Sequence, residues 1–282
     1  MTVVVLAGGT GGAKLARGVA EVVGDDLVVI ANTGDDVEIH GGHVSPDPDL
    51  VTFWLDDVID ERGWGLRGDT FAVMDELRRL GEDVWFSLGD RDLAWCLARA
   101  RRLAAGERLT SIVAELSRGR VLPMCDEPVR TFINGRPFQE WMIRVGGEVE
   151  SVESRGRGTV SPEVRDALGR AERIVIGPSN PVISIGPILH VLGDAIRACG
   201  APVIAVSPLV GREVVKGPTA AFLRWAGVEQ SPAGVASHYG DLLDGMVADE
   251  ECPGVPTLVC DVAMPDVGAA ARLARDVVGF FP

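Results

Sequence analysis

The chain has 282 residues, of which 46% are hydrophobic, and its formal net charge is −14 at pH 7. This length and this apolar content suffice for one large α/β domain with an insertion or for two modest domains, and they argue against a disordered chain. The negative charge argues against a surface for nucleic acid or for an anionic membrane, so we expect small molecules or proteins as partners.

The first predicted element is a strand, Val3 to Ala7, that ends in Gly8-Gly9-Thr10-Gly11-Gly12. A continuous apolar run is typical of a central parallel strand, and the apolar spacing from Ala13 to Val23 predicts a helix directly after it. Glycines at such a turn let the backbone approach a ligand, and the N–H groups at the helix start favour a phosphate. The run matches neither common nucleotide motif, because Lys14 replaces the third glycine of the dinucleotide fingerprint and Leu15 replaces the Ser or Thr of the P-loop. A tight turn without a ligand is the alternative.

A second strand is predicted from Leu27 to Ala31, and it ends in Asn32-Thr33-Gly34-Asp35-Asp36. Open α/β sheets bind ligands outside the carboxyl ends of their strands, so these aspartates are expected near the glycine loop. The segment Ser45-Pro46-Asp47-Pro48-Asp49 follows, and its prolines predict a non-helical loop that reaches the same place. Several carboxylates without a nearby basic residue indicate a bound cation, and hard oxygen ligands suit magnesium or manganese. The alternative is an Asx turn whose aspartates bond their own backbone.

Residues 50 to 120 are predicted to form a mostly helical lobe, with helical spacing in Thr70–Leu80 and Leu93–Ala104. Asp69 is the expected N-cap of the first of these helices, and the strand-like Val84–Ser87 precedes the turn Leu88-Gly89-Asp90-Arg91-Asp92. This turn suits a capping and ion-pair network as well as a ligand contact. The region also contains the tryptophans Trp54, Trp64, Trp85 and Trp95. They would pack in a core or form a flat wall for an aromatic substrate.

A small β element is predicted next, because Asn134-Gly135 is a strong hairpin signal. Upstream, Arg130 is a candidate for binding a substrate phosphate or carboxylate, and an ion pair with Asp126 or Glu127 is the equal alternative. Residues 146 to 158 are polar and contain several glycines, which suggests a boundary back into the main sheet. Ser161-Pro162-Glu163 then predicts the start of a helix.

The second half resumes the α/β alternation with a strand at Arg173–Ile176, the loop Gly177-Pro178-Ser179-Asn180-Pro181 and a helix from about Ile188 to Cys199. The loop offers hydroxyl, amide and backbone donors at the carboxyl edge of the sheet, where they would hold a phosphate or a base. A turn without function is the alternative. The remaining predicted elements are strands at Pro202–Val206, Met246–Ala248 and Thr257–Val259 and helices at Thr219–Ala226, Val235–Leu243 and Val267–Phe280.

Several chemistries are disfavoured. The five cysteines form no C-x-x-C pair and the four histidines have no metal-ligand spacing, which argues against a disulfide framework and a zinc site. No Gly-x-Ser-x-Gly elbow is present for a serine hydrolase. The chain opens on a strand without a basic leader, and no apolar run approaches the ~18 residues that span a bilayer, so we expect a cytoplasmic protein without a membrane partner.

Seven ordered blocks of the sequence resemble the 2-phospho-L-lactate transferases, and they cover nearly the whole chain. They are Gly8-Gly9-Thr10-Gly11-Gly12-Ala13-Lys14-Leu15, Asn32-Thr33-Gly34-Asp35-Asp36, Ser45-Pro46-Asp47-Pro48-Asp49, Trp64-Gly65-Leu66-Arg67-Gly68-Asp69-Thr70-Phe71, Leu88-Gly89-Asp90-Arg91-Asp92, Leu122-Pro123-Met124-Cys125-Asp126-Glu127-Pro128-Val129 and 176–187. The resemblance implies an enzyme of coenzyme F-420 biosynthesis. Such an enzyme joins the deazaflavin Fo (7,8-didemethyl-8-hydroxy-5-deazariboflavin) to a phosphorylated acid carried on a guanosine-diphospho donor, with release of GMP and with magnesium.

The resemblance also implies roles for single residues. Asp35 and Asp49 would be the metal ligands and catalytic, with Asp90 as a third catalytic residue and Asp36 and Asp47 as outer or substitute ligands of magnesium or manganese. Nucleotide and substrate binding would fall to Gly8, Gly9, Thr10, Gly11, Lys14, Asn32, Arg91, Asp126, Arg130, Gly177, Ser179 and Asn180. Where the family pattern reads Pro-Asp-Leu-Asp-Thr, this chain has Pro-Asp-Pro-Asp-Leu at 46–50, which keeps both aspartates and lacks the hydroxyl.

We therefore expect a single α/β domain over residues 1–282: a mainly parallel Rossmann-like sheet with helices on both faces and a helical and small β insertion at about 50–150. The expected reaction is a direct displacement, in which the terminal ribityl hydroxyl of Fo attacks the acid-bearing phosphorus and GMP leaves. Two alternatives are a nucleotide-sugar-binding regulator of the gluconeogenesis-factor type and an NAD dehydrogenase, which lacks its third glycine. The sequence leaves open whether the acid is phospholactate, phosphoenolpyruvate or phosphoglycerate, and whether the chain is a homodimer.

Overall fold

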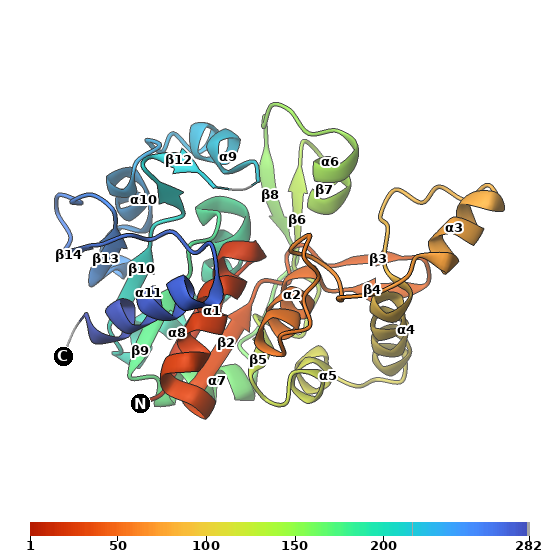
Figure 1. Ribbon diagram of the computed structural model, residues 1–282, viewed down its shortest axis with the longest axis horizontal. Coiled ribbons are helices and arrows are strands. Elements are labelled where there is room, and N and C mark those ends of the chain that lie inside the picture. The colour runs from red at the N-terminus through yellow and green to blue at the C-terminus, as the bar shows by residue number, and fades with distance from the viewer. Residues whose placement is uncertain (216, 281–282) are drawn as a thin grey trace.

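The structure is a computed structural model that describes residues 1–215 and 217–280 (Figure 1). Its centre is a seven-stranded sheet in which all neighbouring strands are parallel. In spatial order the strands are β14 (Thr257–Val259), β13 (Gly245–Ala248), β10 (Val203–Val206), β9 (Arg173–Ile176), β1 (Val3–Ala7), β2 (Leu27–Ala31) and β5 (Val121–Pro123). This is the Rossmann order with one added strand. The predicted fold class is confirmed.

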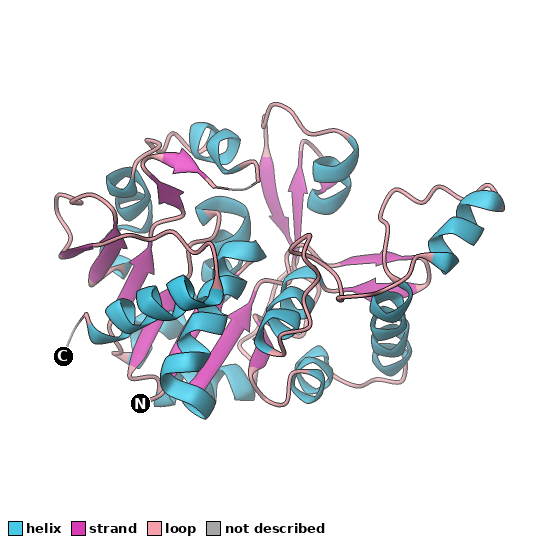
Figure 2. Ribbon diagram, in the orientation of Figure 1, coloured by secondary structure: helices cyan, strands magenta, loops and turns pink. Residues whose placement is uncertain are grey.

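Helices cover both faces of the sheet, as Figures 1 and 2 show. The side chains of β1 alternate between the two sides, because Val4 and Leu6 belong to one buried cluster while Val3, Val5 and Ala7 belong to the other. The helices are α1 (Gly9–Val23), α2 (Pro46–Leu55), α3 (Ala72–Arg79), α4 (Asp90–Ala104), α5 (Leu109–Leu116), α6 (Phe138–Arg144), α7 (Pro162–Arg170), α8 (Gly186–Cys199), α9 (Thr219–Trp225), α10 (Pro232–Tyr239) and α11 (Val267–Gly279). Full coverage explains why the central strands are continuous apolar runs.

Two insertions flank the edge strand β5. The first contains the hairpin of β3 (Val37–Ile39) and β4 (Gly42–Val44), with α3 and α4; we call residues 37–44 and 56–104 the lobe, seen at the right of Figure 1. The second contains α6 and a small sheet of β6 (Arg130–Ile133), β7 (Arg136–Pro137) and β8 (Val152–Arg155). A further pair is β11 (Leu209–Val210) and β12 (Glu213–Val214). The sequence predicted one insertion, because a strand as short as β5 gives little periodic signal.

Two tight turns make the small hairpins. The predicted turn at Asn134-Gly135 is confirmed, with φ values of 50° and 76° that suit a two-residue β-hairpin loop. The β3–β4 hairpin was not predicted; its turn is His40-Gly41, with φ values of 53° and 76°. Histidine is a rarer residue at positive φ than asparagine, so this turn carries a weaker sequence signal.

Two local predictions are wrong. Residues 45–49 were expected to be a non-helical loop, but α2 begins at Pro46. Both prolines of this segment lie in the first helical turn, where a backbone N–H has no partner within the helix and its loss costs little. The expected strand Val84–Ser87 is an irregular segment without a ladder. By contrast, the predicted helix start at Ser161 is confirmed, because its hydroxyl accepts the N–H of Val164 at 3.3 Å.

Within the described chain, the segment Pro181–Cys199 is long and apolar enough to cross a membrane by length and composition alone, with a mean hydropathy of 1.4. This differs from the expectation that no apolar run approaches that length. The segment joins a π-helical turn to α8, and Ile188, Leu192 and Ile196 are buried in the same cluster as the side chains of the central strands. Its apolar face is therefore that of a core helix.

Candidate active site

A cavity of about 990 Å³ opens at the carboxyl ends of the central strands, between the main body, the lobe and α6. The sheet order reverses between β1 and β9, and open α/β sheets bind ligands at this point. The sequence-predicted residues that line the cavity are Gly8, Gly9, Thr10, Gly11, Lys14, Asp35, Asp49, Ser179 and Asn180. Asn32 and Gly177 lie directly behind them: Asn32 contacts Asp35, and a Cβ on Gly177 would meet the glycine loop.

The glycine loop is packed against the loop that follows β9. A Cβ on Gly11 would lie 2.0 Å from the carbonyl oxygen of Pro178, and one on Gly12 would lie 2.8 Å from Oγ of Ser179. The N–H of Gly8 donates to the same hydroxyl at 3.4 Å. Because these positions have no side chains, the two backbones meet and form one wall of the cavity.

Replacing Gly11 by alanine is expected to destabilise the protein by about 1–3 kcal/mol, because the new methyl group overlaps backbone that is packed on both sides. Gly169→Ala in α7 is the matched control, since a Cβ there meets nothing within 4 Å. That variant should be as stable as the wild type or more stable by up to ~1 kcal/mol. Urea denaturation of both variants measures the difference, and equal stabilities would show that the two loops separate without cost.

Two buried carboxylates face each other across the amide of Asn32. Its Nδ2 donates to Oδ1 of Asp35 at 3.1 Å and to Oδ2 of Asp47 at 3.0 Å. The N–H of Gly9 also donates to Asp47, at 2.6 Å, and Oδ1 of Asn32 accepts the N–H of Gly34 at 2.8 Å. The start of α1, the turn after β2 and the start of α2 therefore converge on one acidic pair.

Burial raises the pKa of both carboxyl groups. Desolvation and then the charge of Asp47 raise the pKa of Asp35 well above its ordinary 3.8. Desolvation likewise raises the pKa of Asp47 to about 6. In the described chain, no lysine or arginine forms an ion pair with either carboxylate. Two like charges without a counter-charge are unfavourable in a buried site, so the pair suits a cation.

Asp49 has a different partner. Its two oxygens accept from the guanidinium of Arg99, which is fully buried, and one of these hydrogen bonds is 3.0 Å long. Arg99 also donates to the carbonyl oxygen of His43 at 3.0 Å. Burial raises the pKa of Asp49, although the charge of Arg99 opposes the rise. Asp49 lines the cavity, but its carboxylate is bound by Arg99. The structure therefore offers two candidate pairs of metal ligands: the predicted pair Asp35 and Asp49, and the pair Asp35 and Asp47.

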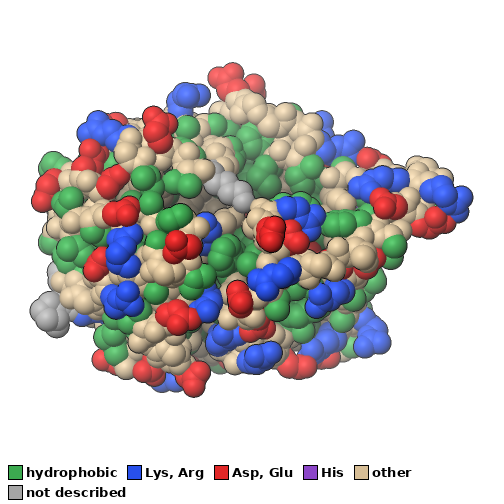
Figure 3. Space-filling model, viewed as in Figure 1, with side chains coloured by type: hydrophobic (Ala, Val, Ile, Leu, Met, Phe, Trp, Pro, Cys, Tyr) green, Lys and Arg blue, Asp and Glu red, His purple; other side chains and the backbone are tan. Residues whose placement is uncertain are grey.

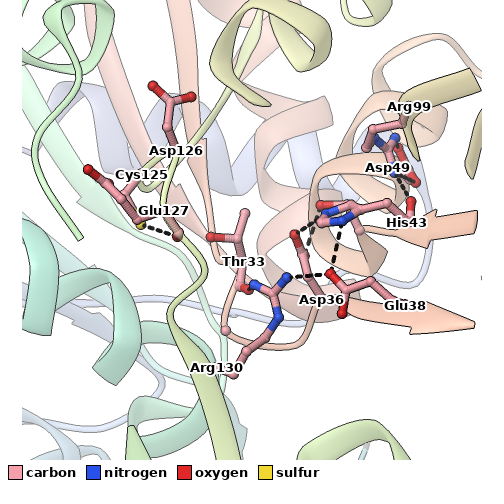
Figure 4. Close-up of polar contacts among 12 residues, drawn as sticks. Thr33, Asp36, Glu38, His43, Asp49, Arg99, Cys125, Asp126, Glu127 and Arg130 are labelled. Atoms are coloured by element: carbon pink, nitrogen blue, oxygen red, sulfur yellow. Dashed lines mark hydrogen bonds and ion pairs between the residues drawn. The ribbon is translucent and has the colours of Figure 1, made fainter. Parts of the chain in front are cut away.

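The second aspartate of the turn after β2, Asp36, belongs to a separate network (Figure 4). It accepts from Nε2 of His43 at 3.0 Å and from the hydroxyl of Ser45 at 2.8 Å. Nδ1 of His43 lies 3.2 Å from Glu38, whose carboxylate also pairs with Arg130 at 3.0 Å. This chain of contacts ties the β3–β4 hairpin to the start of β6.

The stabilising effect of His43 is expected to depend on pH. Burial opposes its protonation, but hydrogen bonds to Asp36 and Glu38 outweigh burial and raise the pKa of His43 from 6.5 to about 9. A raised pKa stabilises the folded state fully below the unfolded value of 6.5, and this stabilisation is lost as pH rises through about 9. The shift corresponds to on the order of 3 kcal/mol. The stability difference between wild type and His43→Gln, measured by urea denaturation, should shrink by that order between about pH 6 and pH 10; a constant difference would contradict the assignment.

The charged turn before α4 caps two helices. The carboxylate of Asp90 accepts from the N–H groups of the first two residues of α3 at 3.1 and 3.0 Å. Asp69 accepts from the N–H groups of Arg91 at 3.0 Å and of Asp92 at 3.1 Å, and so caps α4. The prediction that Asp69 caps the helix Thr70–Leu80 is therefore wrong. Asp90 and Arg91 do not line the cavity in the described chain, and their substrate roles stay predictions.

Asp126 and Arg130, also predicted to bind substrate, line a second cavity of about 630 Å³ between the β3–β4 hairpin, α4 and α5. Asp126 accepts the N–H of Thr110 at 2.7 Å, near the start of α5. Arg130 pairs with Glu38 instead of the expected Asp126 or Glu127. The structure does not bring these two residues to the main cavity, and their substrate roles stay predictions.

The lobe supplies an aromatic wall to the main cavity. Trp64 and Trp85 line it together with Phe86. Trp64 is 44% exposed, an unusual surface for so large an apolar side chain. The other two tryptophans, Trp54 and Trp95, pack in an apolar cluster beside α2. Trp54 and Trp95 therefore pack in a core, and the role of Trp64 and Trp85 as a wall for an aromatic substrate stays a prediction.

Two polar residues of the site, Gln139 and Arg99, were missed, and Asp92 was named only within the turn Leu88–Asp92, as part of a capping network or a ligand contact. Asp92 lines the cavity, and desolvation followed by the charges of Asp49 and Asp69 raises its pKa to about 7. Its orientation depends on α4 starting at Asp90, whereas the sequence predicted a start at Leu93. Gln139 lines the cavity from α6, and Arg99 lies in a predicted helix. Basic residues on helices are usually exposed, so nothing in the sequence indicated that Arg99 is buried.

The chain is similar to known proteins over most of its length. A family model described as 2-phospho-L-lactate transferase CofD matches residues 3–259. The phosphoenolpyruvate transferase of Streptomyces griseus is 39% identical, over 99% of this chain and 98% of that protein. The 2-phospho-L-lactate transferase of Methanosarcina mazei is 38% identical, over 88% of this chain and 86% of that protein.

A solved structure shares the fold. The crystal structure of a UPF0052 family member from Bacillus halodurans matches with a TM-score of 0.62 and covers 98% of both chains, at 16% sequence identity. A likeness at this identity concerns the fold alone.

Proposed function

The chain belongs to the 2-phospho-L-lactate transferase family, and on that premise we propose that it acts in coenzyme F-420 biosynthesis. It moves a phospholactyl or phosphoenolpyruvyl group from a guanosine-diphospho donor to the deazaflavin Fo and releases GMP. The observation that carries this proposal is the composition of the cavity. One site combines a glycine loop suited to phosphates, an acidic pair suited to a cation and an aromatic wall suited to a planar acceptor.

The acidic pair fits a divalent cation. Asp35 and Asp47 lie together in a buried site, and their shared contact, Asn32, is neutral. Carboxylate oxygens are the ligands that magnesium and manganese prefer. We assign Asp35 and Asp47 as the residues that hold this ion, since the oxygens of Asp49 are already bound by Arg99. When bound, the ion would neutralise charge on the donor diphosphate.

The side chains around the glycine loop would hold the donor. The start of α1 presents backbone N–H groups to the phosphates, and Ser179 and Asn180 add donors from the facing loop. Lys14 lies at the same edge, where its Nζ donates to the carbonyl oxygen of Met264 at 2.9 Å, and would offset phosphate charge. In the reaction the hydroxyl oxygen of Fo forms a bond to the acid-bearing phosphorus and gives up its proton, while the bond from that phosphorus to the phosphate oxygen of GMP breaks and GMP leaves with the electron pair. Positioning and charge stabilisation suffice, without a covalent enzyme intermediate.

The proposed setting of the reaction is the cytoplasm. The five cysteines are free thiols, as expected in a reducing cytoplasm. On the face drawn in Figure 3, basic and acidic side chains are interspersed, without the one-sided basic patch that nucleic acid requires. Together with the net charge of −14, this distribution supports small-molecule substrates as the proposed partners, with no nucleic acid and no membrane.

A transfer assay tests the function. The protein is incubated with Fo, magnesium and a guanosine-diphospho donor that carries phospholactate, phosphoenolpyruvate or phosphoglycerate, and GMP release is followed together with the mass of the deazaflavin product. We expect release with a phospholactyl or phosphoenolpyruvyl donor; relatives with both names are similarly identical to this chain, so identity does not select the acid. Tight nucleotide binding without GMP release from any donor would instead indicate a binding regulator.

A further inference from the structure

Gln139 is the polar residue on an otherwise apolar face of α6. Gln139, Met142 and Ile143 are spaced at i, i+3 and i+4 on this helix, and all three line the main cavity. Met142 and Ile143 are exposed, whereas Gln139 is buried. Burying an amide costs free energy unless the amide is hydrogen-bonded, so Gln139 is expected to have a polar partner within the site.

That partner is Asp35. Its buried carboxylate already accepts a hydrogen bond from Nδ2 of Asn32 at 3.1 Å, and the side chain of Gln139 forms a second hydrogen bond with it. Burial and the charge of Asp47 raise the pKa of Asp35. The hydrogen bonds of Asn32 and Gln139 both oppose this rise. A hydrogen bond that lowers the pKa of a carboxyl group stabilises the charged form, so an amide N–H of Gln139 is the donor.

The helix that carries Gln139 is held on the main body by aromatic packing. Phe138 and Trp141 of α6 pack against Phe222 of α9, with ring centroids 6.2 and 5.7 Å from that of Phe222. Ile183, from the turn after β9, belongs to the same buried cluster. Packing therefore fixes the backbone at Gln139, and a side chain on a rigid element is suited to holding its partner in one orientation.

The charge of the donor matters as much as its position. Gln139 and Asn32 are neutral, so they orient the carboxylate of Asp35 without cancelling its charge. Asp49, by contrast, is bound by the guanidinium of Arg99, which supplies a full positive charge. A neutral donor leaves the carboxylate available to a cation, and carboxylates that bind metal ions are generally oriented by such hydrogen bonds.

We propose that Gln139 is a positioning residue for the metal site: its amide donates a hydrogen bond to Asp35 and holds that carboxylate in the orientation that binds the cation. This inference rests on the proposed function, in which Asp35 and Asp47 hold the ion. Gln139 acts through Asp35 and does not contact the ion itself.

Metal binding measured without turnover tests the proposal. Calorimetric titration with Mn²⁺ in the presence of GDP is expected to give a Kd about 10-fold weaker for Gln139→Met, which keeps the length of the side chain and removes the donor. The Kd of GDP measured without metal should keep its wild-type value. Glu140→Met is the matched control, because this neighbouring residue pairs with Arg136 outside the cavity and its loss should change neither Kd.

Gln139→Glu separates positioning from direct contact with the ion. The carboxylate has nearly the shape of the amide but has no N–H group, so it would face Asp35 with a like charge. Mn²⁺ binding should then weaken at least as much as in Gln139→Met. If Gln139 instead bound the ion through its carbonyl oxygen, the new carboxylate would bind Mn²⁺ at least as tightly as the wild type does.

Three results would overturn the proposal. They are wild-type Mn²⁺ affinity in Gln139→Met, undiminished Mn²⁺ affinity in Gln139→Glu, and a lower melting temperature of Gln139→Met with an unchanged Mn²⁺ Kd, which would indicate a merely structural role. The outcome is separable from that of the transfer assay: a wild type that binds Mn²⁺ but releases no GMP refutes the transferase proposal and leaves the titrations to decide on Gln139. A wild type that binds no Mn²⁺ refutes both the metal assignment and the role of Gln139.

Discussion

Asp35→Asn is expected to lower the rate of transfer by about 10³-fold or more while the protein stays folded, because the substitution keeps the size of the side chain and removes a charge that would hold the cation. The same loss is expected for Asp47→Asn. Steady-state GMP release at limiting magnesium measures the effect. Near-wild-type turnover in a folded Asp35→Asn protein would show that this carboxylate is not a metal ligand.

The pH dependence of stability provides an independent test of the carboxylate pair Asp35 and Asp47. The pKa of Asp35 is raised well above 3.8 and that of Asp47 is raised to about 6, so ionising both in the metal-free folded protein costs stability as pH rises through these values. Magnesium is therefore expected to raise the melting temperature more above pH 7 than near pH 5, and Asp35→Asn should weaken this effect. Asp36→Asn is the adjacent control: it should lower stability, because His43 and Ser45 lose an acceptor, and leave the magnesium effect in place.

Arg99→Met is expected to destabilise the protein by about 3–5 kcal/mol, because the substitution leaves Asp49 buried without its counter-charge. For a domain of this size the change corresponds to a fall in melting temperature on the order of 10 °C. Asp49→Asn should destabilise similarly, since it leaves the guanidinium uncompensated. Thermal and urea denaturation of both variants measure these losses, and a wild-type stability for Arg99→Met would contradict the structural role of the pair.

The double variant Arg99→Met with Asp49→Leu makes this test specific. Two apolar side chains replace two charges, so much of the lost stability should return, as for other buried ion pairs. A stable double variant also separates the two metal assignments. If Asp35 and Asp47 hold the ion, magnesium should still raise its melting temperature; if Asp49 is a ligand, that increase should disappear.

The fold was predictable where a single stretch of sequence determines an element. Val3–Ala7 and Leu27–Ala31 are apolar throughout because they are covered on both faces, and the structure has these bounds unchanged. The first insertion was harder to predict. α2 starts at Ser45-Pro46, the same kind of signal that correctly predicted the helix after Ser161, but the second proline, Pro48, led to the prediction of a loop. The β3–β4 turn contains a histidine, so its sequence signal is weak.

The site was predictable at the ends of strands and unpredictable where two distant segments meet. The glycine loop and Asp35 follow buried strands, and their place at the carboxyl edge follows from the sheet alone. The partner of Asp49 lies 50 residues further along the chain, inside a helix. No local sequence pattern indicates such a contact. For the same reason the sequence did not predict that Asp90 caps α3 and that Asp69 caps α4.

The central position of β1 has a consequence for synthesis on the ribosome. β1 and α1 are translated long before two of their partners: β1 obtains its second neighbour only with β9, and one side of α1 is covered only when α11 packs on it, where a Cβ on Gly18 would lie 2.3 Å from the carbonyl oxygen of Ala270. At a translation rate of ~5–20 residues per second, these surfaces of β1 and α1 stay uncovered for roughly 10–50 s until their partners have been synthesised. Residues 262–265 also line the cavity, so a nascent chain that ends before Val262 carries the whole glycine loop without a complete cavity.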